Sequence, residues 1–367
     1  MGVSTGSTGG ISLSQWNVAP TAPVDPKVAS SVPLSVLDLA SVYDGGSHAG
    51  ALADTLIVAR EADRLGYRRF WVAEHHGMPA VASSSPAVLL AAVAAVTTNI
   101  RIGSGGVMLP NHSSLIVAEQ FGTLVALYGD RVDLGLGRAP GTDGVVMAKI
   151  RRGGIAESAD DFPQQLSELL AYFGSIPALD TGEGSRILAI PGMGDAPQLW
   201  LLGSSDFSAR LAGRLGLRFA FAHHFGGGAG GVSGSNTPLV FDLYRRSFRP
   251  SALMTEPHAM VSATTLVADD AAEARRLLLP HALMMLRLRS GLRPGRVPSL
   301  AEAESYEWTP RDNAFVDQTV ASQAIGDVAH VRARIDALAA ETGADEFLVV
   351  PQGPSVETRL RTVRELG

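Results

Sequence analysis

The segment that decides the fold is IRIGSGGVMLPNHSSLIVAEQFGTLVALYGDRVDLGLG, residues 100–137. Two runs of β-branched and apolar residues, at 100–107 and 131–137, enclose a stretch of helical periodicity at 114–128. Short apolar strands that alternate with longer helical stretches are typical of parallel sheets built from repeated βα units. This segment therefore predicts one strand–helix–strand unit.

The same alternation continues along the chain and predicts eight strands, at 34–39, 69–74, 100–107, 131–137, 198–203, 218–223, 259–267 and 346–350. The predicted helices are 50–65, 84–97, 114–128, 160–173, 205–216, 237–248, 270–288, 325–342 and 355–366, and Gly66, Gly129, Gly216 and Gly343 are predicted as C-caps in the left-handed conformation. Eight such units close a (β/α)8 TIM barrel. A doubly wound sheet is less favoured, because SVYDGGSHAG at 41–50 lacks the G-x-G-x-x-G spacing of a dinucleotide site.

The predicted organisation is a flexible N-terminal arm, 1–32, followed by a single barrel domain, 33–367. The arm is rich in Gly, Ser, Thr and Pro and lacks the apolar core of a signal peptide. Two intervals, about 140–197 after the fourth strand and 290–322 before the eighth, are too long for plain loops and are interpreted as insertions. The first contains a candidate hairpin at 178–192, and the second is interpreted either as a lid or as surface elaboration.

Composition limits the classes of function. With 46% hydrophobic residues, 18% charged residues and a formal charge of -6, the chain resembles a soluble globular protein and lacks the basic balance of a nucleic-acid-binding protein. The basic pairs, among them Arg68-Arg69, are predicted to be solvated. There is no cysteine, which excludes disulfides and thiolate chemistry. The longest apolar run, 87–96, is about half of the ~20 residues that span a bilayer, so a cytoplasmic location with no membrane partner is expected.

In a TIM barrel the active site lies at the C-terminal ends of the strands. The predicted strand ends carry Asp38, Glu74-His75-His76, Ser104-Gly105-Gly106, Arg138, Ser204-Ser205 and His223-His224. Adjacent histidines on a strand point to opposite faces, so the doublet after the second strand is not predicted to bind a metal. We expect His75 to face the barrel mouth and handle a proton, and His76 to bond a backbone carbonyl, with Glu74 as support.

Two further features suggest a bound cofactor. Glycines inside a strand mark close approach by a ligand or another backbone, and Gly105-Gly106 would leave room for a flat ring. Arg138 and the helix N-terminus that follows Ser204 would together bind a phosphate group, because helix N-termini present free N–H groups.

The motifs FWVAEHHGMP (70–79), GSGGVMLPNHSSLIVAEQF (103–121), RVDLGLGRAPGTD (131–143) and LWLLGSSDFSARLAGRLGLRFAFAHHF (199–225) resemble the bacterial luciferase-like monooxygenase family, and most of all its single-component subfamily. The resemblance implies a TIM barrel that binds reduced FMN at its mouth and uses oxygen to oxidise a small organic substrate. It also implies a flavin reductase as partner and a homodimer formed through helices near the second and third strands, including 86–96.

The resemblance assigns roles to individual residues. His75 matches the histidine implicated in proton transfer and in stabilising the flavin–oxygen intermediate, while Arg138 and Ser204 match residues at the FMN phosphate. The other cofactor-binding candidates are Ser104, Gly105, Gly106, Gly203, Ser205 and Asp206, and the candidates for substrate contact or support are Glu74, His76 and His224. Gly105-Gly106 falls where the family often has a non-prolyl cis peptide.

One departure from luciferase is Gly137, which stands where luciferase has a cysteine, so thiol-dependent properties are not implied. Two alternatives stay open. One is a deazaflavin-dependent oxidoreductase, although such relatives usually carry Asp-His at the end of the second strand. The other is a flavin-binding protein without turnover.

Overall fold

A computed structural model describes residues 30–151, 161–175, 187–225, 236–292 and 295–367. Most of the predicted arm and most of the predicted hairpin lie outside these residues. The division into an arm and a single domain stays a prediction.

The strands form a closed parallel barrel. They are β1 (Leu34–Asp38), β2 (Arg69–Val72), β3 (Arg101–Met108), β4 (Val132–Gly137), β5 (Gln198–Gly203), β6 (Arg218–Phe221), β7 (Ala259–Val267), β8 (Ala324–Gly326) and β9 (Glu346–Pro351). Each of β1 to β7 pairs in parallel with the next in the chain, and β9 closes the ring between β7 and β1. The predicted eight-stranded TIM barrel is confirmed.

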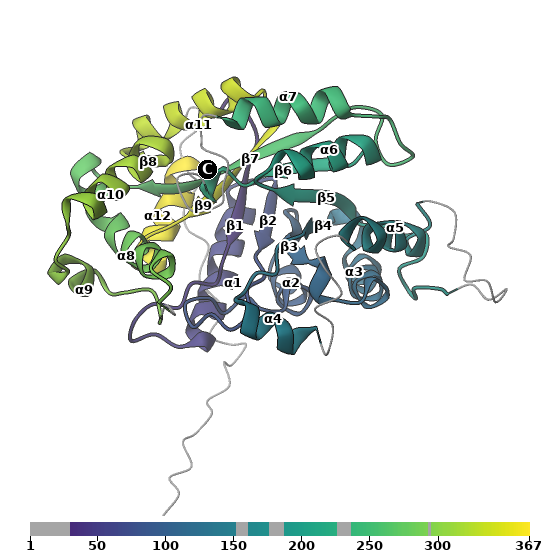
Figure 1. Ribbon diagram of the computed structural model, residues 1–367, viewed down its shortest axis with the longest axis horizontal. Helices are drawn as coiled ribbons and strands as arrows, with labels where there is room; N and C mark the ends of the chain where they lie inside the picture. The colour runs from purple at the N-terminus through teal and green to yellow at the C-terminus, as the bar shows by residue number, and fades with distance from the viewer. Residues whose placement is uncertain (1–29, 152–160, 176–186, 226–235, 293–294) are drawn as a thin grey trace, which may run out of the picture.

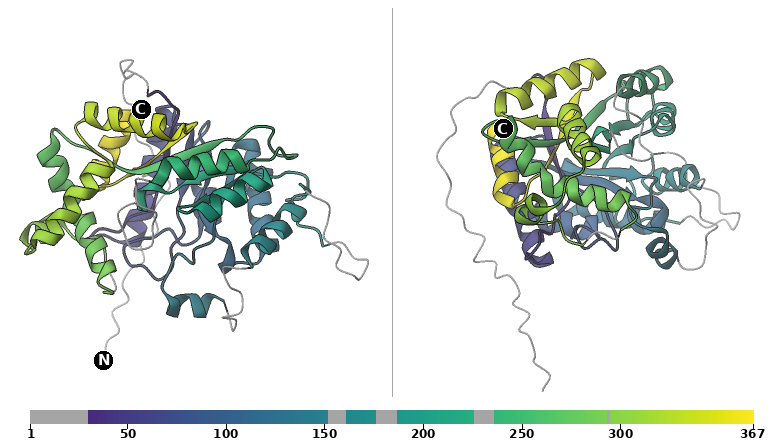
Figure 2. Two further views of the ribbon diagram at one scale, coloured as in Figure 1. Left: turned by 45° about the horizontal axis from the view of Figure 1, so that its top comes forward. Right: turned by 60° about the vertical axis from the view of Figure 1, so that its left-hand side comes forward.

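Helices surround the barrel in the pattern of a (β/α)8 fold (Figure 1, Figure 2). They are α1 (His48–Arg64), α2 (Pro86–Ala95), α3 (Ser114–Tyr128), α4 (Gly144–Ile150), α5 (Phe162–Tyr172), α6 (Asp206–Leu215), α7 (Thr237–Ser247), α8 (Ala271–Arg289), α9 (Leu300–Ser305), α10 (Pro310–Ser322), α11 (Val328–Thr342) and α12 (Val356–Leu366). In the described residues, no helix is both long and apolar enough to cross a membrane.

Besides α4, which the sequence pattern did not predict, and a β2 that ends two residues earlier than predicted, four details differ from the sequence prediction. A short strand, β8, pairs with the end of β7 outside the ring and precedes α11, in a position that was predicted as helix. β6 is shorter than predicted and gives way to a 3-10 turn at His223–Phe225. Gly129 has a positive φ, but its ψ of -156° is not left-handed helical, unlike Gly216 and Gly343.

The second insertion contains the fourth difference, two helices that the sequence pattern did not reveal. α9 and α10 pack beside α8 on one side of the barrel (Figure 1), and Val316 of α10 joins a buried apolar cluster with Leu278 of α8. Val297, just before α9, exchanges backbone hydrogen bonds with the loop after β1. The insertion therefore adjoins the C-terminal end of β1, while its interpretation as a lid stays a prediction.

Alternation along each strand decides which residues face the interior. The apolar cluster inside the barrel includes Trp71, Trp200, Met260 and Leu348. The two indole rings pack edge to face, with their centroids 5.3 Å apart. Below them, at the N-terminal ends of the strands, Arg69 is 1% exposed. The prediction that the pair Arg68-Arg69 is solvated is wrong for Arg69, which lies inside the barrel between two buried carboxylates.

Candidate functional site

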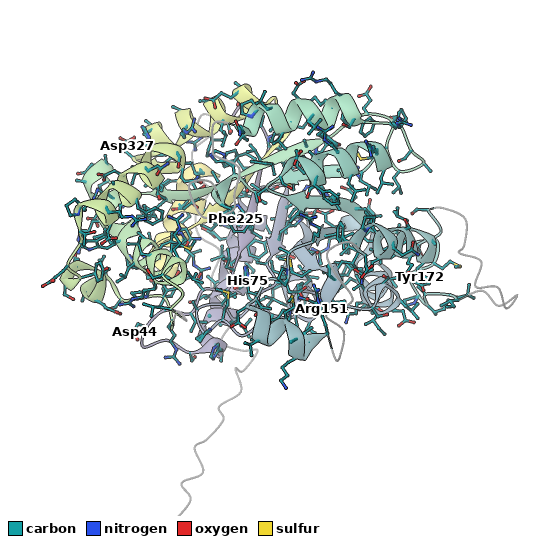
Figure 3. All side chains as sticks on the ribbon, in the orientation of Figure 1. Asp44, His75, Arg151, Tyr172, Phe225 and Asp327 are labelled. Atoms are coloured by element: carbon teal, nitrogen blue, oxygen red, sulfur yellow. The ribbon has the colours of Figure 1, made fainter. Side chains whose placement is uncertain are left out.

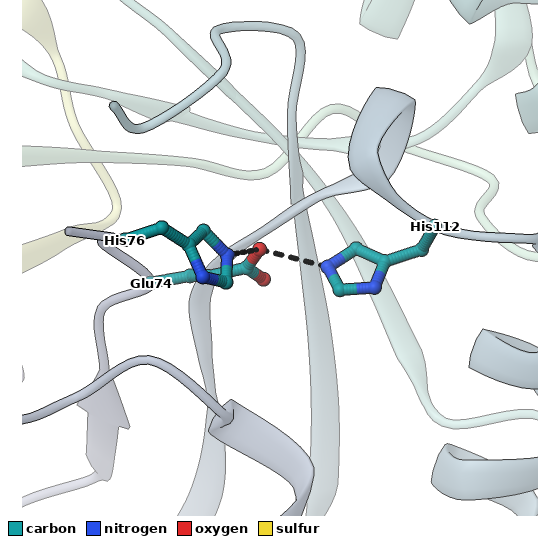
Figure 4. A group of neighbouring side chains, drawn as sticks. All are labelled: Glu74, His76 and His112. Atoms are coloured by element: carbon teal, nitrogen blue, oxygen red, sulfur yellow. Dashed lines mark hydrogen bonds and ion pairs between the residues drawn. The ribbon is translucent and has the colours of Figure 1, made fainter. Parts of the chain in front are cut away.

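The polar strand ends meet at the C-terminal rim of the barrel. Glu74, two residues after the end of β2, is fully buried, and one of its carboxylate oxygens accepts hydrogen bonds from Nε2 of His76 and Nε2 of His112, both at 2.7 Å (Figure 4). The other oxygen accepts from the backbone N–H of Met108 at 3.1 Å. Burial by itself raises the pKa of Glu74, but the hydrogen bonds from His112 and His76 outweigh it and hold that pKa below its usual value.

This cluster corrects two expectations. His76 bonds a carboxylate and not a backbone carbonyl, and neither His76 nor Glu74 is recorded bonding the ring of His75. His112 is absent from the sequence prediction. The one sequence feature that could have indicated its place at the rim is its position four residues after the end of β3, inside the segment NHSS.

The ligand atoms of Glu74, His76 and His112 lie within 4.8 Å of one another, which is a spacing that a metal ion can bridge. The observed N···O separations of 2.7 Å match direct charge-assisted hydrogen bonds. We therefore describe the cluster as a clamp between the loops that follow β2 and β3. The expectation that the chain binds no metal stays a prediction.

His75 has the unpaired ring of the first doublet. Its backbone N–H donates to Ser83, but its buried Nδ1 has no hydrogen-bond partner among the described residues. Burial lowers the pKa of His75, so the ring is neutral at physiological pH. In Figure 3, His75 and Phe225 both lie in the central part of the view, whereas Asp44 and Asp327 lie toward its edge.

Arg138 follows β4 and lies against the start of α6. Its guanidinium carbon is 4.4 Å from the centre of the Phe207 ring, and no carboxylate partner of Arg138 is recorded among the described residues. Ser205 occupies the N-cap position of α6, but its side chain does not cap the helix. Within the part of the chain that the structure describes, a cation without a carboxylate partner therefore lies beside a helix N-terminus that its N-cap side chain does not cap.

The other residues predicted near the start of α6 differ in the groups that they could present to an anion. Ser204 is half-buried between β5 and α6. The Asp206 carboxylate is 69% exposed and 3.9 Å from Arg210, so it turns toward solvent and leaves only its backbone N–H for an anion. A Cβ on Gly203 would collide with the Ser208 side chain, so glycine is required there for close packing of β5 on α6.

Ser104, Gly105 and Gly106 join β3 to its neighbours. The buried hydroxyl of Ser104 donates to the carbonyl of Gly135 at 2.9 Å and accepts from the N–H of Gly135 at 3.1 Å, so its single proton is already used. The Gly105-Gly106 peptide is cis, as the resemblance implied. A Cβ on Gly106 would lie 2.7 Å from the Gly135 carbonyl oxygen, so the glycine there serves strand packing, whatever else it contacts.

The second histidine doublet divides as the first one does. His223 is buried, and its ring contacts Thr237 at 2.9 Å and the Ser322 carbonyl at 3.1 Å. His224 is half-buried, and among the described residues its one recorded hydrogen bond joins Nδ1 to Ser262 at 2.6 Å. Each doublet therefore has one ring that is bonded into the framework and one ring with a free nitrogen at the barrel rim.

Asp38, at the end of β1, is fully committed to its neighbours. It accepts from Arg359 of α12 at 2.5 Å, from the Thr55 hydroxyl at 2.8 Å and from the Ala40 N–H at 2.7 Å. This buried pair connects β1 to α12 and leaves no free carboxylate at that strand end.

Comparison with known proteins identifies the family to which this chain belongs. Residues 33–346 match the sequence model of the luciferase-like monooxygenase family. The chain belongs to the luciferase-like monooxygenase family. It is 45% identical over 319 residues to the uncharacterised Bacillus subtilis protein YvbT, covering 86% of this chain and 90% of that protein. It is 39% identical over 335 residues to a luciferase-like monooxygenase of Escherichia coli, covering 90% and 95% of the two chains.

Solved structures of this family share the fold. The apo form of MsnO8 superposes with a TM-score of 0.78 at 37% identity, covering 91% of this chain and 97% of that one. The fold is also similar to that of the oxygenating constituent of a diketocamphane monooxygenase in complex with FMN. The two chains are 18% identical and superpose with a TM-score of 0.65, covering 91% of this chain and 96% of that one. The similarity also extends to an F420-dependent secondary alcohol dehydrogenase, at 16% identity and TM-score 0.66, with 92% and 98% covered. This chain is therefore an enzyme of the luciferase-like monooxygenase family.

Proposed function

We propose that the enzyme is a monooxygenase that takes reduced FMN and molecular oxygen and oxidises a small organic substrate. The observation that carries the proposal is the pairing of Arg138 with the uncapped N-terminus of α6. A phosphate group on a flavin chain supplies the acceptor oxygens that this cation and these N–H groups lack.

The residues present fit such a group. The guanidinium of Arg138 lies over the Phe207 ring, and the backbone donors of α6 lie at the same rim. From there β4, β3 and β2 are consecutive neighbours in the ring, so a planar ring would extend past Gly105-Gly106 toward His75. Reduced FMN, when bound, supplies the electrons that activate oxygen.

The protein's own part is proton handling and exclusion of water. His75 is neutral, has a buried nitrogen without a partner, and stands beside the path of the ring, so it can accept or hold a proton there. Glu74, His76 and His112 close the rim beside it by joining the loops after β2 and β3. A barrel that takes reduced FMN from solution requires a separate flavin reductase.

Fluorescence titration with FMN, oxidised and then reduced under anaerobic conditions, tests the proposal. We expect saturable binding of FMN, and we expect Arg138→Ala to weaken it by about 10- to 100-fold. This factor corresponds to the loss of charge-assisted hydrogen bonds that contribute about 1.5–3 kcal/mol to the binding free energy. Arg210→Ala is the control, because Arg210 lies on the same helix with its side chain 52% exposed and is 3.9 Å from Asp206.

A parallel titration with the deazaflavin F420 separates the second cofactor class. Tighter binding of F420 than of FMN, or an Arg138→Ala variant that binds FMN as well as the parent does, would refute the proposal. Oxygen consumption with reduced FMN and a panel of aldehydes, ketones and aromatics then identifies the substrate class.

We also propose that the enzyme is a homodimer through α2 and α3. Val88 on α2 is 73% exposed, and Ile116 and Leu127 on α3 are 47% and 66% exposed. Large apolar side chains exposed on two adjacent helices mark an association surface better than scattered ones do.

A further inference from the structure

His224 is held by a single side chain of the neighbouring strand. Its Nδ1 lies 2.6 Å from the Oγ of Ser262, which is 2% exposed within β7. Met260, two residues before Ser262, belongs to the apolar cluster inside the barrel, so strand alternation places Ser262 on the inner side as well. The His224 ring also packs on Phe225, with ring centres 4.2 Å apart.

The hydrogen bonds of Ser262 determine where the His224 ring carries its proton. The Ser262 hydroxyl lies 3.1 Å from the carbonyl oxygen of Phe221, which can only accept. The hydroxyl has one proton, and when that proton goes to the carbonyl the hydroxyl accepts a hydrogen bond from the imidazole. In this arrangement Nδ1 of His224 carries the ring proton, and Nε2 has a bare lone pair with no hydrogen-bond partner among the described residues.

The ring stays neutral under ordinary conditions. Burial lowers the pKa of His224 to about 3, and the charges that His223, His75 and His281 would carry act in the same direction. A neutral imidazole with its proton on Nδ1 offers a hydrogen-bond acceptor at Nε2 and cannot donate from it.

His224 lies on a different part of the barrel rim from most of the cofactor residues proposed above, although it is close enough to His75 for that ring's charge to act on its pKa. Arg138 and His75 follow β4 and β2, and Gly105-Gly106 lie within β3, whereas His224 follows β6 and Ser262 lies within β7. Glu74 and Asp38, the carboxylates at the C-terminal ends of β2 and β1, are already paired with histidines and with Arg359. A cation bound there would lack a counter-charge, and an anion would face another acceptor.

We propose that Nε2 of His224 accepts a hydrogen bond from a hydroxyl or N–H group of a neutral organic substrate, and that Ser262 is the positioning residue that keeps the ring proton on Nδ1. The assignment of this part of the mouth to substrate rests on the proposed function, which assigns the cofactor to the other part. It narrows the substrate class to uncharged hydrogen-bond donors.

The first test measures the tautomer directly. Nitrogen-15 spectra of the histidine-labelled protein, with the His224 signals identified by their loss in His224→Asn, report which nitrogen carries the proton. We expect an unprotonated Nε2 in the parent, the same in Ser262→Thr, which keeps the hydroxyl, and a mixed tautomer in Ser262→Ala. A protonated Nε2 in the parent, or no change in Ser262→Ala, would overturn the proposal.

The second test uses four small probes that share one ring, namely benzyl alcohol, benzyl methyl ether, benzoate and benzylamine. Each is titrated into the protein with and without FMN while the Nε2 signal of His224 is followed. We expect benzyl alcohol alone to shift the signal saturably. The binding of benzyl alcohol to the parent and to His224→Asn, whose amide can still donate to Ser262, is measured by calorimetry. We expect it to weaken in the variant by about 10-fold, which corresponds to the loss of one hydrogen bond.

The remaining outcomes are decisive as well. An equal response to the ether, stronger binding of benzoate or benzylamine, or no response to any probe would overturn the assignment. The assignment would also be overturned if FMN alone shifted the Nε2 signal and benzyl alcohol then caused no further shift. If FMN does not bind but benzyl alcohol shifts the signal, the proposed function fails and the role of His224 stands.

Discussion

At the scale of single residues, the barrel's N-terminal end is held by buried charges. Arg69 donates to Glu346 at 2.9 Å and to Asp133 at 2.7 Å, and Asp133 also accepts from Arg101 at 2.9 Å and from the Trp71 ring N–H at 3.0 Å. Ser35 donates a further short hydrogen bond to Glu346. Removing one member of such a network leaves a buried charge without its partner, which is costlier than the loss of a surface pair.

We predict that Glu346→Gln lowers the free energy of unfolding by about 3 kcal/mol near neutral pH, measured by urea denaturation. Arg68→Ala is the matched control. Arg68 lies 3.4 Å from the same carboxylate but is 46% exposed, so its loss should cost about 1 kcal/mol or less. Equal losses in the two variants would contradict the buried network.

The effect of Glu346→Gln should depend on pH. Burial by itself raises the pKa of Glu346, but contact with His258 and the charge of Arg69 outweigh it, and the folded-state pKa is lowered. A lowered pKa stabilises the fold at pH values above the unfolded value of about 4.3, and this contribution is lost as the pH falls through the folded-state pKa. The difference between parent and variant should therefore shrink below about pH 4, and a constant difference would show that the carboxylate does not titrate with folding.

At the scale of elements, β4 shows how glycine spacing shapes the barrel wall. β3 and β4 shift register between Ser104 and Val107, and Gly135 faces that shift. A Cβ on Gly135 would collide with the Ser104 carbonyl oxygen, which is backbone and cannot move aside. A Cβ on Gly137 would lie 2.9 Å from Met108 Sδ, near the flexible end of a side chain.

We predict that Gly135→Ala destabilises the protein by about 1–3 kcal/mol or more, because overpacking against backbone forces the strands apart. Gly137→Ala, two residues along the same strand, should change the unfolding free energy by less than about 1 kcal/mol, because Met108 can adopt another rotamer. Thermal unfolding of both variants checks this. A Gly137→Ala variant that is the less stable of the two would contradict it.

At the scale of the whole molecule, the proposed dimer is tested by charge at its centre. We predict that Val88→Asp combined with Leu127→Asp converts the enzyme from a dimer to a folded monomer, measured by light scattering at matched concentrations, because a desolvated carboxylate opposes association. Leu239→Asp on α7 is the control, since Leu239 is 64% exposed on a helix remote from α2 and α3 (Figure 1). A monomeric parent, or dissociation by the control, would refute the α2–α3 interface.

The sequence by itself determined that the chain forms a barrel and that its polar strand ends lie at the C-terminal rim of that barrel. Strand and helix periodicity are local, and a closed parallel barrel brings every strand's C-terminal end to one rim, so His75, Arg138 and the start of α6 could be assigned to that rim from their own segments. Tertiary structure alone decided which groups are free there. Glu74 meets His112 and His224 meets Ser262 across 38 residues in each case. The burial of Arg69 likewise depends on Glu346, 277 residues away. Periodicity gives the face on which a side chain lies within its own element, but such pairings depend on inter-strand register and loop paths, which only the packed barrel sets.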